Sequence, residues 1–315
     1  HRAARGRRNQ PAVQAFAVNL ECHLNAMLTG LERGEFAVGR FHQFLIRDPK
    51  QRVITAPEFS ERVMHHAVMN VLEPILDRWL IADTYACRRG LGRERAVARA
   101  QQFTASGEWF LKLDVRKYFD SICHDRLLYF LGRKLADVQL LQLLERIIKG
   151  FRGNLGEGLP IGSLTSQHFA NFYLGWLDRY VKEVLRARRY VRYMDDMVVW
   201  HHERAELHAM HLRIREFTAT QLGLELKPAA VTGVSCGVPF LGCKVYPTHT
   251  ILNRKSRVRW QRQLKMLLRA YRLGLIPEIE LQQRLESLTA FAKSAGARSW
   301  QFRQRVLERL VVNDH

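Results

Sequence analysis

Acidic residues, paired cysteines and long apolar runs are all scarce in this chain. Only 30 Asp and Glu stand against 50 Lys and Arg, so the formal net charge is +20. The five cysteines are odd in number and scattered, which predicts free thiols in a reducing compartment rather than a disulfide framework. No apolar run approaches the roughly 18 residues of a membrane span, and no signal peptide opens the chain. We therefore expect a cytoplasmic protein whose partner is a polyanion.

Several common ligand-binding patterns are also missing. The Gly90-Leu91-Gly92 stretch lacks the third glycine and the strand context of a dinucleotide fingerprint. No lysine follows the glycine-rich loop that begins at Gly156, so a P-loop phosphate cradle is not expected. Cys236, Cys243 and His249 lack the paired spacing of zinc ligands. The 315 residues are nevertheless enough for two or three subdomains with a sizeable core.

The most informative stretch is a pair of adjacent carboxylates, Asp195 and Asp196. They lie at a tight reversal between two runs of strand-forming residues, a pattern that predicts a β-hairpin. Two like charges about 4 Å apart repel by about 4 kcal/mol at an effective dielectric constant near 20, so a half-buried pair needs a cation. The alternative is a solvated turn, since Asp is a common turn former.

A third carboxylate, far upstream, favours the cation site. In Leu111-Lys112-Leu113-Asp114 the period-two alternation puts the leucines on one face of a strand and Asp114 on the other. A strand that places Asp114 beside Asp195 and Asp196 creates an all-oxygen site suited to Mg²⁺. Two such ions could stabilise the attacking and leaving oxygens of a phosphoryl or nucleotidyl transfer.

These motifs resemble those of reverse transcriptases. Tyr193-Met194-Asp195-Asp196 resembles the polymerase signature, and Leu113-Asp114 resembles the opening of the preceding catalytic motif. The resemblance covers roughly residue 41 to the end. It implies an α+β right-hand polymerase with fingers, a palm that contains an antiparallel sheet, and an α-helical thumb. It also implies RNA-directed DNA polymerase activity, with two Mg²⁺ ions held by Asp114, Asp195, Asp196 and the backbone carbonyl of Val115.

The chain is expected to divide into four regions: a basic N-terminal arm and helix (1–40), fingers interleaved with the palm (41–108), the palm with its catalytic motifs (109–250) and a helical thumb (251–315). The arm contains four arginines within its first eight residues and is either a disordered tail or a phosphate-gripping arm. Helices are expected over 11–33, over 58–80 with a break near Pro74, over 127–149, from a cap near Ser163 or Thr165, over 205–222 and over 254–272, with two more after Pro277 and Gly296.

The resemblance implies several contacts with an incoming nucleotide. Arg52, with Arg47 or Lys50, would contact the triphosphate from a basic hairpin tip, because arginine offers a bidentate fork. A solvated tip is the alternative. Arg88 follows an aromatic-rich strand and would approach the triphosphate or the template. Phe119 is at the steric-gate position, where its ring would collide with a 2′-hydroxyl and select deoxynucleotides. Otherwise Phe119 is a core residue.

The glycine-rich loop departs from most reverse transcriptases. Ile161 stands where most members have Gln before Gly162, and Ser166-Gln167 replaces their Ser-Pro. This combination resembles the reverse transcriptases of diversity-generating retroelements, which copy a template RNA with frequent errors at adenines. By the resemblance, Ile161, Gly162 and Gln167 would contact the nucleotide. An apolar Ile removes a polar restraint beside the nascent base pair, which favours misincorporation. Alternatively, Ile161 merely packs.

Contacts with nucleic acid are implied at three places: the signature residues Tyr193 and Met194, the primer-grip hairpin with Leu241 and Gly242, and the basic face of the helix over 254–272 with Arg254, Lys255, Arg257 and Arg262. That basic face would follow a duplex by its phosphates, or it is only a solvated face.

A general acid for the leaving pyrophosphate is less clearly marked. Ala229 and Ala230 stand where relatives often have lysines, which leaves Lys227 as the substitute.

Two rival functions stay open. One is another bacterial reverse transcriptase, of group II intron, retron or phage-defence type. The other is an RNA-binding scaffold with an idle polymerase site, which the three aspartates and Phe119 argue against. No zinc-type endonuclease or long maturase extension follows the expected thumb, so a full group II intron protein is not expected. The retroelement resemblance implies a bacterial or phage-encoded protein whose partners are deoxynucleoside triphosphates, a structured template RNA with its cDNA, and a small basic oligomeric accessory variability protein.

Overall fold

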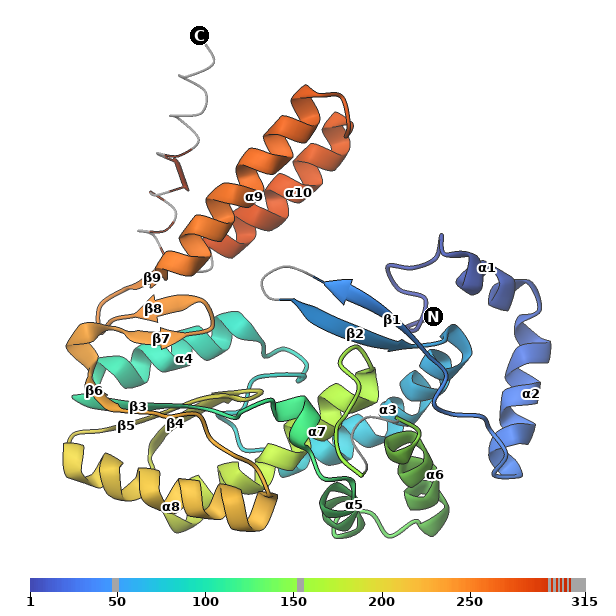
Figure 1. Ribbon diagram of the computed structural model, residues 1–315, viewed down its shortest axis with the longest axis horizontal. Coiled ribbons are helices and arrows are strands. Elements are labelled where there is room, and N and C mark those ends of the chain that lie inside the picture. The colour runs from blue at the N-terminus through green and yellow to red at the C-terminus, as the bar shows by residue number, and fades with distance from the viewer. Residues whose placement is uncertain are drawn as a thin grey trace. The chain divides into compact units, whose positions relative to one another are not determined.

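The computed structural model describes the chain except residues 47–50, 152–155, 294–295, 297–298, 300, 302, 305 and 307–315 (Figure 1). The chain forms two compact units, and each is assembled from separate stretches of sequence. The first unit contains residues 1–82, 115–180 and 214–227, and the second contains 83–114, 181–213 and 228–315. The four regions expected from the sequence stay a prediction.

The first unit is mainly helical and includes one antiparallel hairpin. Its elements are α1 (Pro11–Val18), α2 (Leu20–Glu32), β1 (Phe41–Ile46), β2 (Arg52–Pro57), α3 (Phe59–Trp79), the 3₁₀ turn η1 (Tyr118–Ser121), α5 (His124–Gly132), α6 (Val138–Lys149) and α7 (Leu164–Arg179). Helices α3 and α7 pack together, and α5 contacts both α6 and α7. The expected hairpin is confirmed, because β1 pairs with β2 from Phe41 opposite Pro57 to Ile46 opposite Arg52.

The N-terminal arm is packed rather than disordered. The Arg2 side chain donates to Asn70 Oδ1 at 2.8 Å, and Arg62 Nε donates to the carbonyl of Ala3 at 2.9 Å. Ala3 is buried as a result. The disordered-tail interpretation is therefore wrong, and the phosphate-gripping role stays a prediction.

Three expectations about where a helix is continuous or broken are wrong. The stretch 11–33 is interrupted at Asn19, whose φ of −118° and ψ of 46° lie outside the helical region. The stretch 127–149 is two helices, and Asp137 caps the second by accepting from Leu140 N at 3.0 Å. Conversely, α3 continues through Pro74. Pro74 is exposed, so the carbonyl that loses its helical partner can bond to water.

The second unit contains two antiparallel sheets. The four-stranded sheet has the order β4 (Arg189–Tyr193), β5 (Asp196–His201), β3 (Trp109–Asp114), β6 (Val231–Gly233). The three-stranded sheet contains β7 (Val238–Phe240), β8 (Cys243–Val245) and β9 (Thr250–Leu252). Helix α4 (Arg93–Ala105) contacts strands of both sheets, and Figure 1 shows it between them. The short helix η3 (Val234–Cys236) also belongs to this unit. Two elements are divided between the units: η2 (Tyr180–Val184) begins with Tyr180 of the first unit, and α8 (Arg204–Leu222) contributes 204–213 to the second unit and 214–222 to the first.

The core of the second unit lies against α4. Ala96 and Ala100 are fully buried, and their small side chains let the helix approach the sheets closely. Phe103 and Trp200 pack with their ring centroids 5.7 Å apart. The core therefore anchors β5 at Trp200, four residues after Asp196 at its start.

Two helices follow the three-stranded sheet, α9 (Arg254–Arg272) and α10 (Glu278–Lys293). The expected bounds of α9 are confirmed, and Asn253 caps it by accepting from Ser256 N at 2.8 Å. The helix buries Trp260, Leu264 and Leu267. Trp260 Nε1 donates to the carbonyl of Leu288 in α10 at 3.0 Å. Most residues of the expected third helix lie outside the described part of the chain.

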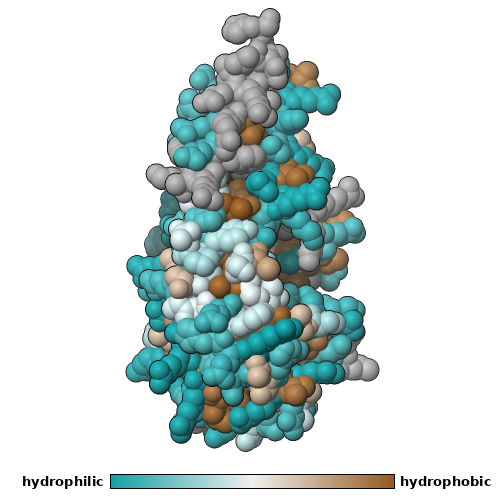
Figure 2. All heavy atoms as spheres, turned by 90° about the vertical axis from the view of Figure 1, so that its left-hand side faces the viewer, coloured by the Kyte–Doolittle hydropathy of each residue, from teal (hydrophilic) through white to brown (hydrophobic). Residues whose placement is uncertain are grey.

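A helix that spans a membrane must be both long and apolar. Within the described ranges, no helix combines the length and the apolar character that crossing a bilayer requires. On the face shown in Figure 2, apolar side chains are scattered among hydrophilic ones.

Candidate active site

The adjacent aspartates lie at a hairpin turn, as the sequence predicts. Tyr193 in β4 pairs with Asp196 in β5, which leaves Met194 and Asp195 as a two-residue connection. Met194 has φ of +55°, a left-handed conformation that such short connections require. The solvated-turn alternative does not describe this hairpin, because both aspartates are only partly exposed and the flanking strands are buried.

The third aspartate lies opposite this turn. Asp114 ends β3 and is the cross-strand partner of Asp196. Directly opposed residues of antiparallel strands have Cα atoms about 4.5–5.5 Å apart. Leu111 and Leu113 are buried, whereas Asp114 on the other face is partly exposed. The sheet therefore brings Asp114, Asp195 and Asp196 to one end, while their catalytic role stays a prediction.

Lysine 112 is the residue of this site that sequence reasoning missed. Its Nζ lies 3.2 Å from Asp196 Oδ1 and donates to Oδ2 at 3.4 Å. The same alternation that exposes Asp114 places Lys112 two residues earlier on the same face. That spacing is the signal which could have identified it.

The carboxyl group of Asp196 has an unusual proton affinity. Burial raises its pKa to about 6, although the ammonium of Lys112 and the backbone N–H of Leu241 oppose the rise, while the nearby charge of Asp114 adds to it. Asp196 Oδ1 is buried, and its contact with the Lys112 ammonium at 3.2 Å is an ion pair without hydrogen-bond geometry. A buried oxygen without a well-aligned donor is a candidate acceptor for a bound cation.

Replacing Asp196 by Asn should stabilise the metal-free protein in a pH-dependent way. The folded-state pKa lies above the ordinary value of 3.8, so wild type loses stability as pH rises through about 6. At pH 8 the variant should gain up to about 3 kcal/mol in the free energy of unfolding, a value that already includes the opposing effect of the Lys112 ammonium. Urea unfolding with a chelator at pH 8 and pH 4.5 measures this, and an equal gain at both pH values would contradict it.

The donor set fits a hard divalent cation, although the structure contains no ready-made cage. Among the residues the structure describes, no group of three or more His, Cys, Asp or Glu side chains is arranged to hold a metal ion. The carboxylates of Asp114, Asp195 and Asp196 are nevertheless the oxygen ligands that Mg²⁺ prefers, and an ion of this kind keeps water and phosphate ligands. The site therefore fits an ion that is completed by its substrate.

A buried arginine supports the turn between β4 and β5. Arg192 is completely buried, and its Nη1 donates to the carbonyl of Met194 at 3.1 Å. Its backbone is also fixed, because Arg192 N donates to the carbonyl of Asp83 and Tyr85 N donates to the carbonyl of Arg192, both at 3.0 Å. These bonds hold the backbone that precedes Asp195.

The hairpin expected at Leu241 and Gly242 is present in the second unit, and its primer-grip role stays a prediction. Leu241 (φ +46°) and Gly242 (φ +79°) form its two-residue turn between β7 and β8, the conformation of a type I′ turn. Arg93 in α4, which sequence reasoning also missed, holds this turn. Its Nε donates to the carbonyl of Leu241 and its Nη2 to Cys243 Sγ, each at 3.0 Å.

The predicted nucleotide contacts of the first unit lie on segments that two backbone hydrogen bonds join. Leu159 N donates to the carbonyl of Phe119, and Thr55 N, three residues after Arg52, donates to the carbonyl of Ile161, each at 2.8 Å. Gly162 follows Ile161, and an exposed Gln167 lies in the first turn of α7. Backbone hydrogen bonds thus link the three segments that contain Arg52, Phe119 and Ile161–Gly162.

The remaining predicted contacts are dispersed. Arg47 and Lys50 lie outside the described residues. Arg88 lies in the second unit, where its Nη1 donates to the carbonyl of Thr84 at 2.9 Å. Lys227 is exposed in the first unit. The cations expected to bind a duplex are exposed on α9: Arg254, Lys255, Arg257 and Arg262.

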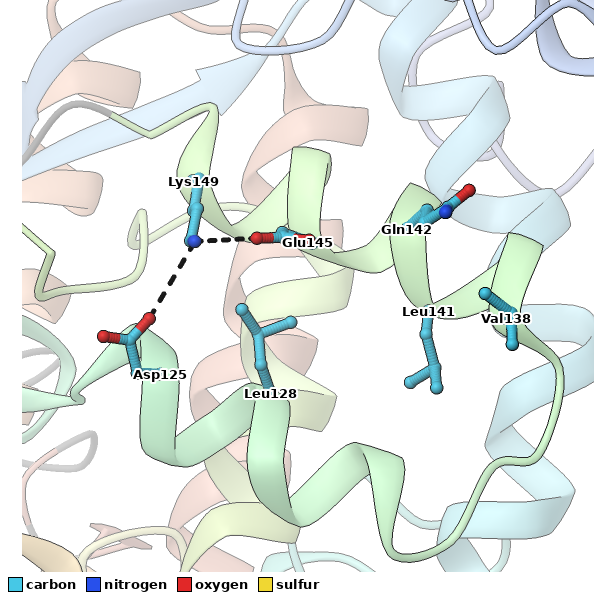
Figure 3. Close-up of a pocket in the computed structure, with 7 residues that line it drawn as sticks. All are labelled: Asp125, Leu128, Val138, Leu141, Gln142, Glu145 and Lys149. Atoms are coloured by element: carbon cyan, nitrogen blue, oxygen red, sulfur yellow. Dashed lines mark hydrogen bonds and ion pairs between the residues drawn. The ribbon is translucent and has the colours of Figure 1, made fainter.

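A shallow pocket of about 270 Å³ between α5 and α6 offers no comparable chemistry. Figure 3 shows Lys149 directed toward two carboxylates, Glu145 at 2.7 Å and Asp125 at 3.9 Å. Leucine side chains line much of the rest. The cation of this pocket is already paired on the surface, so the aspartate site remains the candidate active site.

Comparison with known proteins identifies the family. The family model for reverse transcriptase (RNA-dependent DNA polymerase) matches residues 47–245, so the chain belongs to the reverse transcriptase family. Members of this family generally use divalent metal ions. The matched range includes all three aspartates together with Phe119 and Ile161.

Curated relatives include group II intron-type proteins. Protein YkfC of Escherichia coli K12 is 24% identical over 257 residues, which covers 66% of this chain and 65% of YkfC. The group II intron-encoded protein LtrA of Lactococcus lactis subsp. cremoris is 26% identical over 141 residues, which covers 43% of this chain and 24% of LtrA. The chain thus spans less than two thirds of each of these relatives.

Among solved structures, telomerase from Candida albicans in complex with a fragment of telomeric RNA is similar, with a TM-score of 0.53 and 10% identity. The match covers 75% of this chain and 51% of the telomerase. At that identity the likeness shows the fold alone. The chain has the α+β right-hand polymerase fold that the sequence predicts.

Proposed function

We propose that this chain is an RNA-directed DNA polymerase that copies a template RNA into cDNA. The observation that supports this most directly is the register of β3 and β5, which sets Asp114 opposite Asp196 at the turn that contains Asp195. The match to the family of RNA-dependent DNA polymerases supports an RNA template. An idle scaffold would not need three carboxylates at one strand end, where their mutual repulsion is a cost.

Asp114 and Asp195, with the carbonyl of Val115, would hold two Mg²⁺ ions, and Asp196 would complete the site. When bound, the ions would stabilise charge on the attacking 3′-hydroxyl and on the leaving pyrophosphate. In this proposal Lys112 orients the Asp196 carboxylate from 3.2 Å. Arg52, Arg47 and Arg88 bind triphosphate oxygens, and Lys227 protonates the leaving group.

Nucleic acid would be held by residues of the second unit. Tyr193, Met194, Leu241 and Gly242 contact the primer end, and the exposed cations of α9 bind the phosphates of the template–cDNA duplex. The net charge of +20 supports this arrangement, because a duplex is a polyanion.

We further propose the diversity-generating retroelement subtype, on the basis of Ile161 before Gly162 and of Ser166-Gln167. A small basic oligomeric accessory variability protein and a structured template RNA would then be partners. The site of action would be the cytoplasm of a bacterium, which five free cysteines support. The matches to YkfC and LtrA favour the alternative of a group II intron-type enzyme.

Primer extension followed by cDNA sequencing tests both levels of the proposal. On an RNA template with deoxynucleotides and Mg²⁺, the protein should extend a DNA primer, and substitutions should concentrate at template adenines. A lack of ion-dependent product would reject the polymerase. Extension with equal fidelity at all four template bases would reject only the retroelement subtype and leave the group II intron-type alternative.

Replacing Phe119 by Ala should relax sugar selection. Phe119 is partly exposed as the second residue of the 3₁₀ turn η1, so its ring is accessible to a nucleotide. If the ring excludes a 2′-hydroxyl, its removal should lower the preference for deoxynucleotides over ribonucleotides by about 100-fold, the effect of losing roughly 3 kcal/mol of discrimination. Single-nucleotide incorporation kinetics measure this ratio. Tyr118→Phe is the matched control, because Tyr118 is buried and its change should leave the ratio unaltered.

A further inference from the structure

Four polar side chains form a buried network in the first unit. Glu61 and His65 come from α3, and Ser163 and Thr165 come from the start of α7. Each is at most 2% exposed. Buried polar groups are retained at a cost unless they bond to one another, so such a cluster indicates a specific task. We call these four residues the His65 network.

The contacts run from one backbone segment to another. Gly39 N donates to Glu61 Oε1 at 3.1 Å, and Arg40 N donates to Oε2 at 2.9 Å. Glu61 Oε1 lies 3.5 Å from His65 Nε2. On its other side, His65 Nδ1 bonds to Ser163 Oγ at 3.1 Å. The network thus joins the segment before β1 to the loop before α7.

The hydroxyl of Ser163 bonds to other side chains and does not cap its helix. Ser163 is at the N-cap of α7, where the side-chain oxygen normally accepts from a backbone N–H of the first turn. Here it makes no cap hydrogen bond and instead contacts His65 Nδ1 and, at 2.8 Å, Thr165 Oγ1. Helix α7 thus begins at the expected cap residue Ser163, but the Ser163 side chain does not form the expected cap hydrogen bond. The hydroxyl therefore links the loop before α7 to His65 in α3 and leaves the backbone N–H groups of the first turn of α7 uncapped by Ser163.

His65 can act as a neutral bridge. Burial lowers its pKa to about 4, with smaller contributions from His66 and Arg62, so the ring carries one N–H at neutral pH. With that N–H on Nε2, which lies 3.5 Å from Glu61 Oε1 without forming a hydrogen bond to it, Nδ1 accepts from the hydroxyl of Ser163. The Ser163 oxygen then accepts from Thr165.

The residues that precede Ser163 are held by β2. Thr55 N donates to the carbonyl of Ile161 at 2.8 Å. Gly162 has φ of +127°, and a Cβ atom there would lie 2.8 Å from Ile54 Cγ2 and 3.1 Å from the carbonyl oxygen of Thr55. The Ile161–Gly162 backbone is therefore bonded to β2 and is followed directly by Ser163, whose side chain bonds to His65. A shift of either anchor must move it.

We infer that His65, acting through Ser163, is a positioning residue that sets the Ile161–Gly162 backbone against the incoming nucleotide and so controls nucleotide binding and selection. This inference rests on the proposed polymerase function. It assigns a role to the His65–Ser163 pair, whose members lie 98 positions apart in the chain. Neither side chain touches the nucleotide, because both are buried.

Matched substitutions separate positioning from simple stability. Ser163→Ala and His65→Leu break the His65–Ser163 bond, whereas Ser163→Thr keeps the hydroxyl and His65→Asn keeps a polar atom near the place of Nδ1. The first pair should raise KM for deoxynucleotides about tenfold, the effect of roughly one misplaced hydrogen bond, with kcat within about twofold of wild type. The second pair should stay close to wild type in KM. The ratio of incorrect to correct nucleotide incorporation should likewise change in Ser163→Ala and His65→Leu and stay close to wild type in Ser163→Thr and His65→Asn.

Hydrogen exchange of the Thr55 amide gives a readout that does not depend on activity. Ser163→Ala and His65→Leu should speed its exchange, because its acceptor is the Ile161 carbonyl, while the two conservative variants should not. The inference is overturned if an active wild type and its Ser163→Ala variant share the same KM. It is also overturned if KM in all four variants follows melting temperature alone. A wild type that extends no primer overturns the polymerase function and the nucleotide-selection role together.

Discussion

Asparagine at Asp114 or at Asp195 is expected to reduce kcat for primer extension about a thousandfold, the effect of losing roughly 4 kcal/mol of metal-supported charge stabilisation. Both residues lie at the strand end where β3 and β5 pair. Asn keeps the size of the side chain and removes the anionic ligand. Binding of a template–primer duplex should change little, because that affinity comes mainly from cationic side chains.

The matched control is Asp120→Asn. Asp120 follows Asp114 closely in sequence but is exposed in a 3₁₀ turn, and we do not expect it to be a ligand. Single-turnover extension at saturating deoxynucleotide should show near wild-type rates for this variant. Asp195→Asn within tenfold of wild type, or an equal loss in Asp120→Asn, would be incompatible with the proposed catalytic role.

Replacing Trp200 by Ala should destabilise the protein by about 3–5 kcal/mol, as for other large core truncations. Trp200 is 1% exposed, packs on Phe103 and lies against Gly107, where an added Cβ would be 3.1 Å from Trp200 Cβ. Its removal leaves a cavity against α4. Since Trp200 is on the same strand as Asp196, activity should also fall, and the midpoint of urea unfolding measures the change in stability.

Trp109→Ala serves as the comparison. Trp109 is on the neighbouring strand β3 and is only partly buried, with Arg204 over its ring at 5.3 Å. Its truncation should cost clearly less, because part of its surface is already in contact with water. Equal losses for the two tryptophans would mean that the core against α4 does not set the stability of the sheet.

The elements that the sequence predicts correctly are those with short-range signals. Alternation in Leu111–Asp114 specifies which face of β3 holds the carboxylate, and two strand-forming runs around Asp195 specify a hairpin. Helix α9 has a clear start at Asn253 and the expected end. In each case, residues within a few positions of one another determine the outcome.

The features that the sequence did not reveal depend on contacts between distant residues. Arg93 reaches Leu241 across 148 positions, and His65 reaches Ser163 across 98. Neither residue belongs to a local pattern that distinguishes it from a surface arginine or a packed histidine. Helix boundaries failed for a related reason: Pro74 is tolerated because its side of α3 is exposed, which only tertiary structure decides.

The pairing of Lys112 with Asp196 implies that the resting protein carries its own counter-ion. The mutual repulsion of three neighbouring carboxylates would otherwise oppose folding. Zinc fingers illustrate another arrangement, in which the chain folds only when its metal ion binds. Here the Lys112 ammonium, 3.2 Å from Asp196 Oδ1, offsets part of that repulsion before any metal ion binds. Folding of the chain then does not depend on metal binding. The protein can fold first and bind its substrate, with the ions that accompany it, afterwards.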